Sequence, residues 1–422
     1  MADVLNGAVG RSFTSMDLMA IDHEIAKMTI AGNVRRAARI CIKDWRDHDI
    51  DLFIHSKDDP EKFWSANISV SVDLDFLQGL DRGDPAATAV FDAVVDQMMK
   101  NGEPGFWNKS LAEEHEQAAL CPNPCGEIGL EEFEPCCLGN INLAHFGNDF
   151  YGTSEAARLM ARFLVRATFA DIDDPRQQEV VERNRRIGVG LLGYQEWGAA
   201  HGYRYSQIYK SDIMGAKLTV IAYQAQKAAR EYAAVLGIPA PIKTTCVAPT
   251  GTISSLAGVT AGIHPIYSRF FLRRVRFASD DPLLDDHIAK GHHVEDDVYS
   301  PNTKVVSIPC RDPILDRYDG HLIEQADELS PGDMFATQAF VQKNWSDNAT
   351  SYTVNITSDV SRSHLAAALQ HHLRFLKGAT VFPDVSRPQS PYERIDKDTY
   401  ELSNASEIGQ ALEECVTGCP VR

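Results

Sequence analysis

The sequence predicts an α/β protein in which helices and strands alternate along the chain. Three observations support this fold class. Segments with apolar residues at helical spacing recur, the longest covering residues 212–236. Between these segments, short runs such as 67–72 and 351–356 alternate in polarity with the two-residue period of a strand. The chain has 422 residues, 44% hydrophobic and 24% charged, which is enough for one large α/β domain or two to three smaller ones.

The expected elements follow from local signals along the chain. Ser15 is a suitable N-cap, and apolar residues keep helical spacing after it. The expected helices cover residues 11–45, 86–99, 155–170, 212–236 and 360–375, and the expected strands cover 67–72, 244–248, 351–356 and 378–383. Residues 280–345 form an acidic, polar stretch in which we expect short elements only.

Charge and cysteine content limit the classes of function. The chain has 41 basic and 59 acidic side chains, a net charge of −18, which disfavours broad binding of nucleic acid or of anionic membranes. We find no apolar run of about 18 residues and no secretory signal. Nine cysteines without export indicate a reducing, cytoplasmic environment. Inert burial is the default expectation for Cys41, Cys246 and Cys310.

The stretch 121–143 is the most informative part of the chain, because it holds four cysteines, an amide and a carboxylate. Prolines and glycines argue against regular structure in its first half, at Pro122, Pro124, Gly126 and Gly129. We expect a loop in which Asn123, Cys125 and Glu127 project from one side, as alternate residues do in extended backbone. A thiol beside an amide and a general base is a reactive set.

A zinc site or a disulfide is the simpler alternative for these cysteines. Cys121 and Cys125 could form one half of a zinc site, but the other half would be the adjacent pair Cys136 and Cys137. Structural zinc normally uses separated pairs or histidines. We therefore expect no metal here.

Two motifs in this stretch resemble ribonucleotide reductases. Asn-Pro-Cys-Gly-Glu-Ile at 123–128 resembles the finger loop of that family, and Cys-x-Leu-Gly-x-Ile-Asn-Leu at 136–143 resembles the strand that follows. The resemblance implies that Cys125 carries a thiyl radical and that Asn123 and Glu127 hold and deprotonate the ribose hydroxyls. It implies that Cys136 is one of two reducing thiols. The implied fold is most of a ten-stranded α/β barrel with its first strand or strands missing and the finger loop at its centre.

Further segments resemble the class II, adenosylcobalamin-dependent members. These are Ala-Gly-Asn-Val-Arg-Arg at 31–36 and the Arg-rich segment 267–277. Val381 and Phe382 stand where class I large subunits have two tyrosines for imported radicals. Neither side chain can be oxidised and reprotonated as a phenol can, so we expect the radical to be made on site with adenosylcobalamin. A class I large-subunit fragment and a non-catalytic thiol or zinc-binding protein are the alternatives.

Two glycine-rich segments need different interpretations. Gly188, Gly190 and Gly193 spell G-x-G-x-x-G, but Arg-rich residues precede them and no acidic residue follows at the ribose-binding distance. We expect these glycines to serve close packing. Pro-Thr-Gly-Thr-Ile-Ser at 249–254 follows a strand and can open a helix, which suits a phosphate. The resemblance implies that the substrate is a ribonucleoside tri- or diphosphate. It also implies that its phosphates are bound by Thr250, Gly251, Thr252, Ile253 and Ser254.

The tail and the division of the chain complete the predictions. By resemblance, Cys415 and Cys419 form a redox pair that passes electrons from a thioredoxin-like reductant. The family's third site cysteine lies upstream of everything matched here, and Cys41 does not correspond to it. We therefore expect a separate N-terminal reductase chain as partner. We expect residues 1–120 to end the first barrel half, 121–385 to form the finger loop and second half, and 386–422 to form the tail.

Overall fold

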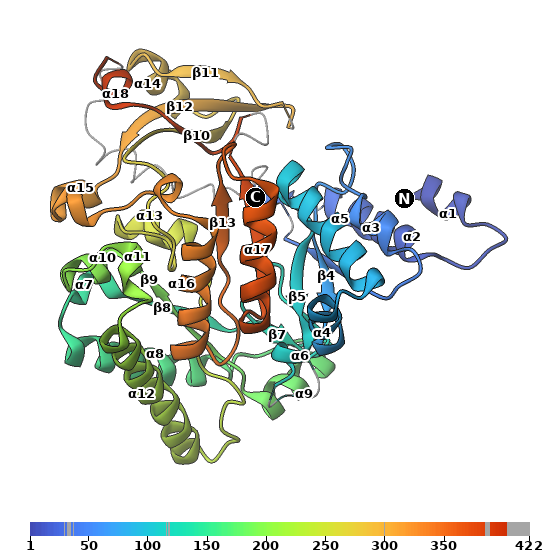
Figure 1. Ribbon diagram of the computed structural model, residues 1–422, viewed down its shortest axis with the longest axis horizontal. Coiled ribbons are helices and arrows are strands. Elements are labelled where there is room, and N and C mark those ends of the chain that lie inside the picture. Colours follow the sequence, from blue (N-terminus) through green and yellow to red (C-terminus); the bar gives the residue numbers. More distant parts are fainter. Residues whose placement is uncertain are drawn as a thin grey trace.

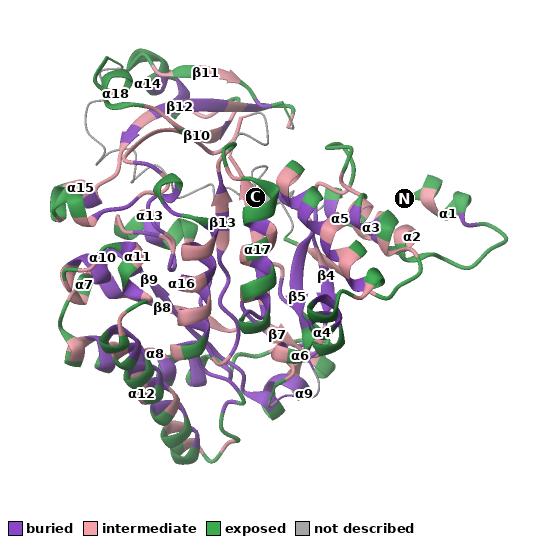
Figure 2. Cartoon of the chain, viewed as in Figure 1, coloured by how far each residue is buried: buried purple, intermediate pink, exposed green. Residues whose placement is uncertain are grey.

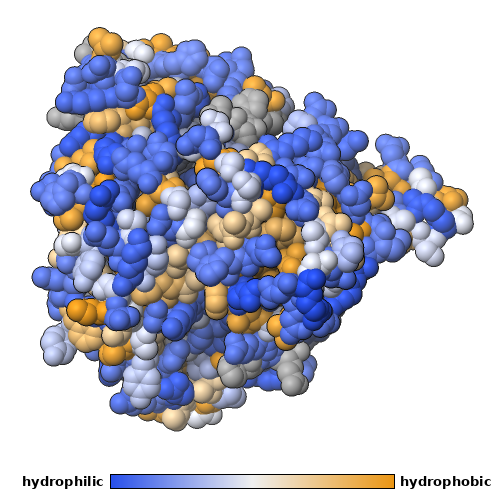
Figure 3. Space-filling view, viewed as in Figure 1, coloured by the Kyte–Doolittle hydropathy of each residue, from blue (hydrophilic) through white to orange (hydrophobic). Residues whose placement is uncertain are grey.

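The structure is a computed structural model that describes residues 1–28, 30–31, 35–36, 38–114, 116, 119–298, 300–384 and 389–402. The side chains of residues 30–31 and 35–36 are not described. The predicted redox pair, Cys415 and Cys419, lies outside the described residues. Among the residues described, no helix combines the length and the apolar character needed to cross a membrane. The face drawn in Figure 3 is largely hydrophilic, with apolar side chains in small patches.

Helices and strands alternate along the described part of the chain (Figure 1). The elements of the first part of the chain are α1 (Ala2–Gly7), α2 (Ser15–Met28), β1 (Ile30–Ala31), β2 (Arg35–Arg36), β3 (Ile40–Asp44), α3 (Ile50–Ile54), β4 (Asn67–Val72), α4 (Leu74–Arg82), α5 (Pro85–Asn101), β5 (Gly105–Asn108), α6 (Lys109–Ala112), β6 (Cys121–Pro122), β7 (Gly129–Leu130), β8 (Leu138–Asn142), α7 (Leu143–Phe146) and α8 (Phe150–Ala167).

The remaining elements continue the alternation. They are α9 (Pro175–Asn184), β9 (Gly188–Leu192), α10 (Tyr194–Ala200), α11 (Tyr205–Ile208), α12 (Asp212–Leu236), α13 (Gly251–Ala257), β10 (Phe270–Ala278), α14 (Leu283–Ala289), β11 (His293–Asp296), β12 (Thr303–Arg311), α15 (Ile314–Arg317), α16 (Pro331–Asn344), β13 (Thr353–Ile356), α17 (Arg362–His372), β14 (Gly378–Pro383), β15 (Tyr392–Arg394) and α18 (Lys397–Leu402).

The strands near the finger loop form one continuous array. β8 pairs in parallel with β9, single parallel bridges join Val189 to Thr245 and Val247 to Thr350, and β13 pairs in parallel with β14. β14 then pairs antiparallel with β5, which continues in parallel to β4 and β3. Two groups of parallel strands thus meet in antiparallel orientation. Within the described residues, β3 and β8 are the two ends of this array.

Capping residues and buried faces explain the main helices. The Asp84 side chain accepts a hydrogen bond from Ala87 N at 2.9 Å to start α5, and Gly102 ends that helix with φ +85°. Ser211 caps α12, and Gly237 ends it in the left-handed region. The long helices α8 and α12 pack along each other. One large core links these helices to the strands, and Figure 2 shows β4 and β5 buried.

A second, smaller sheet lies apart from this array, at the top of Figure 1. Its order is β11-β12-β10-β15, all antiparallel, with its own apolar cluster around Phe277, Val306 and Ile308. Three basic residues of the segment 267–277 are ion-paired in this region. Arg269 binds Glu328, Arg274 binds Glu393 and Arg276 binds Asp297.

Three sequence-based expectations about elements need correction. The helix expected over residues 11–45 covers only Ser15–Met28, and Ile40–Asp44 is a strand because it pairs with β4. Residues 280–345 contain a nine-residue strand, Thr303–Arg311, and a fourteen-residue helix, Pro331–Asn344. Residues 244–248 pair through single bridges at Thr245 and Val247 and do not form a continuous strand. The other expected helices and strands are present, with ends shifted by a few residues.

Candidate active site

The predicted finger loop is a tight hairpin. β6 and β7 pair antiparallel and enclose residues 123–128. Asn123 closes the turn, because its backbone N–H donates to Ile128 O at 2.9 Å and its side-chain Oδ1 accepts from Ile128 N at 3.1 Å. Gly126 N donates to Asn123 O at 2.8 Å, with Gly126 at φ +85°. A side chain at this position would be strained, which accounts for the glycine.

The loop does not project its three polar side chains from one side, as expected for extended backbone. Its tip is a turn, so Asn123 and Glu127 point into the protein, 6% and 2% exposed, while Cys125 is exposed. The alternation rule failed because the turn breaks the two-residue period.

Asn123 and Glu127 instead converge on Cys136. Burial raises the pKa of the Cys136 thiol, and the charge of the nearby Glu127 carboxylate raises it further. A hydrogen bond with the Asn123 side chain acts in the opposite direction. Cys136 therefore remains a neutral thiol at neutral pH, and it is still exposed to reagents. The structure brings three of the four predicted residues, Asn123, Glu127 and Cys136, into one cluster.

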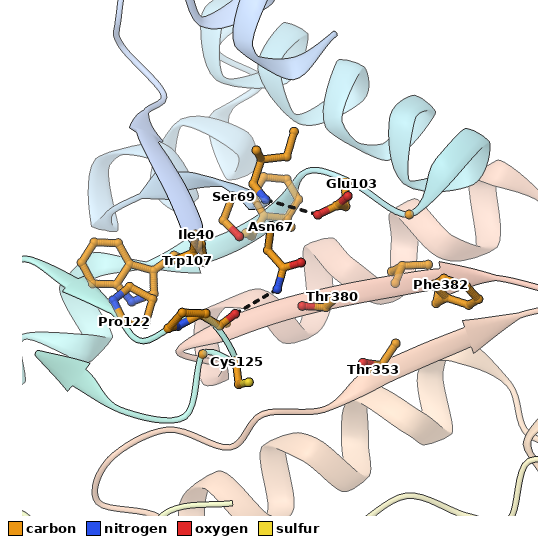
Figure 4. A pocket seen from close by; sticks show the side chains of 18 of the residues that line it. Ile40, Asn67, Ser69, Glu103, Trp107, Pro122, Cys125, Thr353, Thr380 and Phe382 are labelled. Atoms are coloured by element: carbon orange, nitrogen blue, oxygen red, sulfur yellow. Dashed lines mark hydrogen bonds between the residues drawn. The ribbon is translucent and has the colours of Figure 1, made fainter. Parts of the chain in front are cut away.

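Cys125 occupies a different place, at the wall of a cavity between the finger loop and the strand array. Figure 4 shows the Cys125 side chain on the side of the loop that faces the strands carrying Thr353 and Thr380. The cavity combines aromatic rings with hydroxyl and amide groups, and its lining includes Trp64, Asn67, Ser69, Thr353, Thr380 and Phe382. Val381 and Phe382, which stand where class I large subunits have tyrosines, line the same cavity.

Hydrogen bonds to backbone carbonyls hold the tip of the loop against this array. Ala349 N donates to Glu127 O at 2.8 Å, and Asn67 Nδ2 donates to Pro124 O at 3.0 Å, as Figure 4 shows. Beside Asn67, the ion pair of Lys57 with Glu103 at 2.5 Å forms part of the cavity wall. The sequence offered no local signal for any of these contacts, since they join segments far apart in the chain.

The predicted phosphate segment starts a short helix, α13. The Thr250 hydroxyl accepts a hydrogen bond from Gly262 N at 2.7 Å, and the buried Ser254 donates to Gly251 O at 3.2 Å, so both hydroxyls already serve the fold. Gly251, Thr252 and Ile253 are exposed. The first amides of a helix have no partner within it. This segment is linked to the finger loop through Ala349, whose carbonyl accepts from Val247 N at 3.0 Å.

The glycines of the G-x-G-x-x-G pattern serve close packing, as predicted. Gly188 and Gly190 lie in the buried strand β9. A Cβ on Gly188 would overlap the Cys246 sulfur and Leu138, and one on Gly190 would overlap Asn140 Oδ1. The three cysteines expected to be inert differ in burial. Cys246 and Cys310 are buried, whereas Cys41 is intermediate, with burial raising its pKa to about 11.

In the part of the chain that the structure describes, no group of three or more His, Cys, Asp or Glu side chains is placed to hold an ion. His264 acts as a structural hydrogen bonder. Its Nε2 accepts from Thr353 N at 3.0 Å, and its Nδ1 lies 3.0 Å from Ala261 O.

Fold and site together define a class of protein: an α/β array of two opposed parallel strand groups with a cysteine-bearing hairpin against it. Residues 79–244 and 241–379 match the family model described as the ribonucleotide reductase barrel domain. The chain therefore belongs to the ribonucleotide reductase barrel-domain family. The fold class predicted from sequence is confirmed, although the described strands form an open array.

Individual relatives agree with this family. A protein of Mycobacterium phage D29, named provisionally as an adenosylcobalamin-dependent ribonucleoside-triphosphate reductase, is 42% identical over 98% of this chain and 64% of its own length. The adenosylcobalamin-dependent ribonucleoside-triphosphate reductase of Levilactobacillus brevis is 32% identical over 94% of this chain and 55% of its own length. The chain thus spans somewhat over half the length of these relatives.

Solved structures give the same picture. A crystal structure of a B12-dependent (class II) ribonucleotide reductase matches with a TM-score of 0.78 and 28% identity, covering all of this chain and 60% of the other. The class Id ribonucleotide reductase alpha subunit of Actinobacillus ureae matches with a TM-score of 0.62 over 82% of this chain and 70% of the other. At 17% identity, the second match concerns the fold alone.

Proposed function

We propose that this chain is the catalytic part of a ribonucleotide reductase that works by a thiyl-radical mechanism. The observation that carries this proposal is the cluster of Asn123, Glu127 and Cys136 beside a finger loop with Cys125 at its tip. The activity of the relatives named above, and their cofactor, support the same reaction here.

Each of these side chains has a role in the proposed reaction. Cys125, as a thiyl, removes the 3′ hydrogen of the ribose. Glu127 takes the 3′ hydroxyl proton, and Asn123 orients the ribose by hydrogen bonding. The 2′ hydroxyl leaves as water. Cys136 and a second thiol supply two electrons and two protons and become a disulfide. Cys125 then returns the hydrogen to the 3′ carbon and is again a thiyl, and Glu127 returns the proton to the 3′ oxygen, so the reduction balances. The raised pKa of Cys136 suits a thiol that gives up hydrogen.

We propose adenosylcobalamin as the cofactor, with the cavity beside Cys125 holding its adenosyl half. When bound, this group supplies the radical chemistry that starts at Cys125. The aromatic ring of Trp64 and the hydroxyls of Thr353 and Thr380 match the chemistry of a nucleoside, which needs stacking and hydrogen-bonding partners. Val381 and Phe382 in the same wall provide no phenol for an imported radical, which favours this cofactor over a class I system.

The substrate is proposed to be a ribonucleoside triphosphate, with a diphosphate as the alternative. The segment Thr250–Ser254 would bind its phosphates. The exposed backbone amides of Gly251, Thr252 and Ile253 can donate to a ligand there. The Thr250 hydroxyl can donate as well, because its oxygen accepts from Gly262 N and keeps its proton, whereas the Ser254 hydroxyl donates to Gly251 O.

A separate N-terminal reductase chain is the proposed partner. In the described part of the chain, the strand array ends at β3 and β8, and strand edges favour pairing with further strands. A partner that adds strands between these edges would also bring the second reducing thiol. We keep the predicted division at residues 120 and 385, the tail pair Cys415 and Cys419, a thioredoxin-like reductant and a cytoplasmic location as parts of the proposal.

Anaerobic turnover tests the proposal. A ribonucleoside triphosphate is incubated with adenosylcobalamin and dithiothreitol, with this chain alone and with the chain encoded next to it. Deoxynucleotide that forms only in the mixture, and only with the cofactor, supports a split cobalamin-dependent enzyme. Normal rates from this chain alone would exclude the partner. No product in either case, despite a stable complex that binds nucleotide, would contradict the proposed activity.

A further inference from the structure

A buried arginine lies where the chain enters and leaves the finger loop. Arg186 stands between α9 and β9, and its side chain is 2% exposed. Its Nε donates to Glu134 Oε1 at 2.9 Å, and its Nη1 donates to Glu116 Oε2 at 3.0 Å. Its Nη2 also donates to Glu116 Oε1. One planar guanidinium therefore binds two carboxylates, one of them through both oxygens.

The two carboxylates belong to opposite sides of the loop. Glu116 precedes β6, the strand that enters the finger loop. Glu134 follows β7, the strand that leaves it, and stands two residues before Cys136. Arg186 thus connects the entry of the finger loop, its exit and the segment of Cys136 to the start of β9.

Other side chains complete this network, which we call the base network. Lys243 Nζ lies 2.7 Å from Glu116 Oε2. Asn184 Nδ2 donates to Glu134 Oε1 at 3.0 Å, and Glu131 N donates to Glu134 Oε2 at 2.9 Å. Charges buried this deeply are tolerated when their hydrogen bonds are made. A lysine in place of Arg186 has its three donors on a single nitrogen and lacks the planar fork that binds Glu116 through both oxygens while also reaching Glu134.

We propose that Arg186 is a positioning residue, which fixes the finger loop and Cys136 relative to each other so that Asn123 and Glu127 meet the Cys136 thiol. The consequence for catalysis rests on the proposed function. The effect on the geometry of the loop does not, so the two can be tested separately.

Arg185 is a matched control. It is the neighbouring residue, also buried, but its Nη1 donates to Thr168 O at 2.8 Å and its guanidinium stacks on Phe169, at the end of α8. We would compare Arg186→Lys with Arg185→Lys by amide hydrogen exchange and by alkylation of each cysteine with iodoacetamide, read by mass spectrometry at equal distance below each Tm.

In Arg186→Lys, we expect exchange at the hydrogen-bonded amides of Asn123 and Ile128 to rise about tenfold, since exchange of a closed site follows its local opening. Alkylation of Cys136, which is already exposed, should rise by a smaller factor, because a displaced Glu127 carboxylate no longer raises the pKa of that thiol. Alkylation of the buried Cys310, which lies in the second sheet, should stay unchanged. Arg185→Lys should leave the finger loop as in the parent. The proposal is overturned if Arg186→Lys leaves the loop unchanged, or if Cys310 responds as strongly as Cys136.

If Arg186→Lys does not fold, Glu134→Gln replaces it in the same experiments. Glutamine keeps the size of the side chain and removes one charge from the base network. The same loop-specific rise is expected, and its absence would contradict the proposal. In an active mixture, both variants should lower kcat with little change in KM. If exchange and alkylation change in the variants as expected while every mixture is inactive, the proposed function fails and the positioning role of Arg186 stands.

Discussion

The base and the tip of the finger loop are held in different ways. At the base, Arg186 and Lys243 meet Glu116 and Glu134 in a buried network of charges. At the tip, the contacts come from neutral groups, such as Ala349 N on the Glu127 carbonyl. Charged hydrogen bonds in a buried site are strong and directional, and they also shift the pKa of nearby groups.

This difference explains how a loop can be rigid without disturbing its thiols. An anchor of several charges beside Cys125 would change the proton affinity of the sulfur. The base network instead restrains the loop at its two ends, through Glu116 and Glu134. The strong restraint is therefore placed at the ends of the hairpin, and weaker neutral bonds set the tip. The following predictions test this division, from the largest expected effect to the smallest.

Removing a charge from the base should cost the most stability. Glu116→Gln leaves Arg186 and Lys243 buried with less compensation. Breaking one partner out of a buried ion network typically costs about 3–5 kcal/mol. Urea unfolding should show a loss in that range. A loss below about 1 kcal/mol would mean that the base is no stronger than the tip.

Lys377, whose side chain lies next to Lys243 of the base network and donates to Asp347 O at 2.7 Å, should also make stability depend on pH. Burial and the adjacent Lys243 lower the pKa of Lys377 from 10.5 to about 7. Between these values the unfolded chain binds more protons than the folded one, so stability rises with pH from about 7 to about 10.5 and does not change from this source below 7. Lys377→Met should flatten this rise in unfolding measured across pH, whereas Lys343→Met, at an exposed site, should not. If the unfolding free energy of Lys377→Met rose with pH as steeply as in the parent, the lowered pKa of Lys377 would not be the cause of the rise.

A variant at the tip should lose less free energy of unfolding than one at the base. Asn67→Ala removes the hydrogen bond to Pro124 O and should cost about 1 kcal/mol, the usual contribution of one neutral hydrogen bond. The same urea titration measures it beside Glu116→Gln. If the tip variant proved as destabilising as the base variant, the contrast between the two ends of the loop would be lost.

The smallest effect concerns the thiol chemistry. The Glu127 carboxylate raises the pKa of Cys136, so Glu127→Gln should lower that pKa and increase the thiolate fraction near pH 8.5. We expect alkylation of Cys136 to become about two- to threefold faster relative to Cys121, since one pKa unit would give tenfold. Equal rates in parent and variant would place Glu127 outside the electrostatic reach of Cys136.

Local patterns predicted the long helices and the compact motifs. The range 212–236 is confirmed as α12, because Ser211 and Gly237 mark its ends in the sequence. The wrong helix over 11–45 has a different cause. Ile40–Asp44 has no strand pattern strong enough to override its neighbours, and it becomes a strand only by pairing with Asn67–Val72.

The site was predicted in part for the same reason. The residues Asn123, Cys125, Glu127 and Cys136 stand close together in a motif, so their identity could be predicted, but their directions depend on a turn at Gly126. The partners Arg186, Asn67 and Ala349 are far away in the chain. Only the folded arrangement shows that they hold the loop.

Anaerobic reduction with Cys125→Ser beside Cys121→Ser tests the central claim most directly. Both residues are exposed cysteines of the finger-loop region, and a serine at either position keeps the size of the side chain. With adenosylcobalamin, the proposed partner chain and a ribonucleoside triphosphate, we predict no deoxynucleotide from Cys125→Ser and nearly the parent rate from Cys121→Ser. Undiminished product from Cys125→Ser would contradict the account.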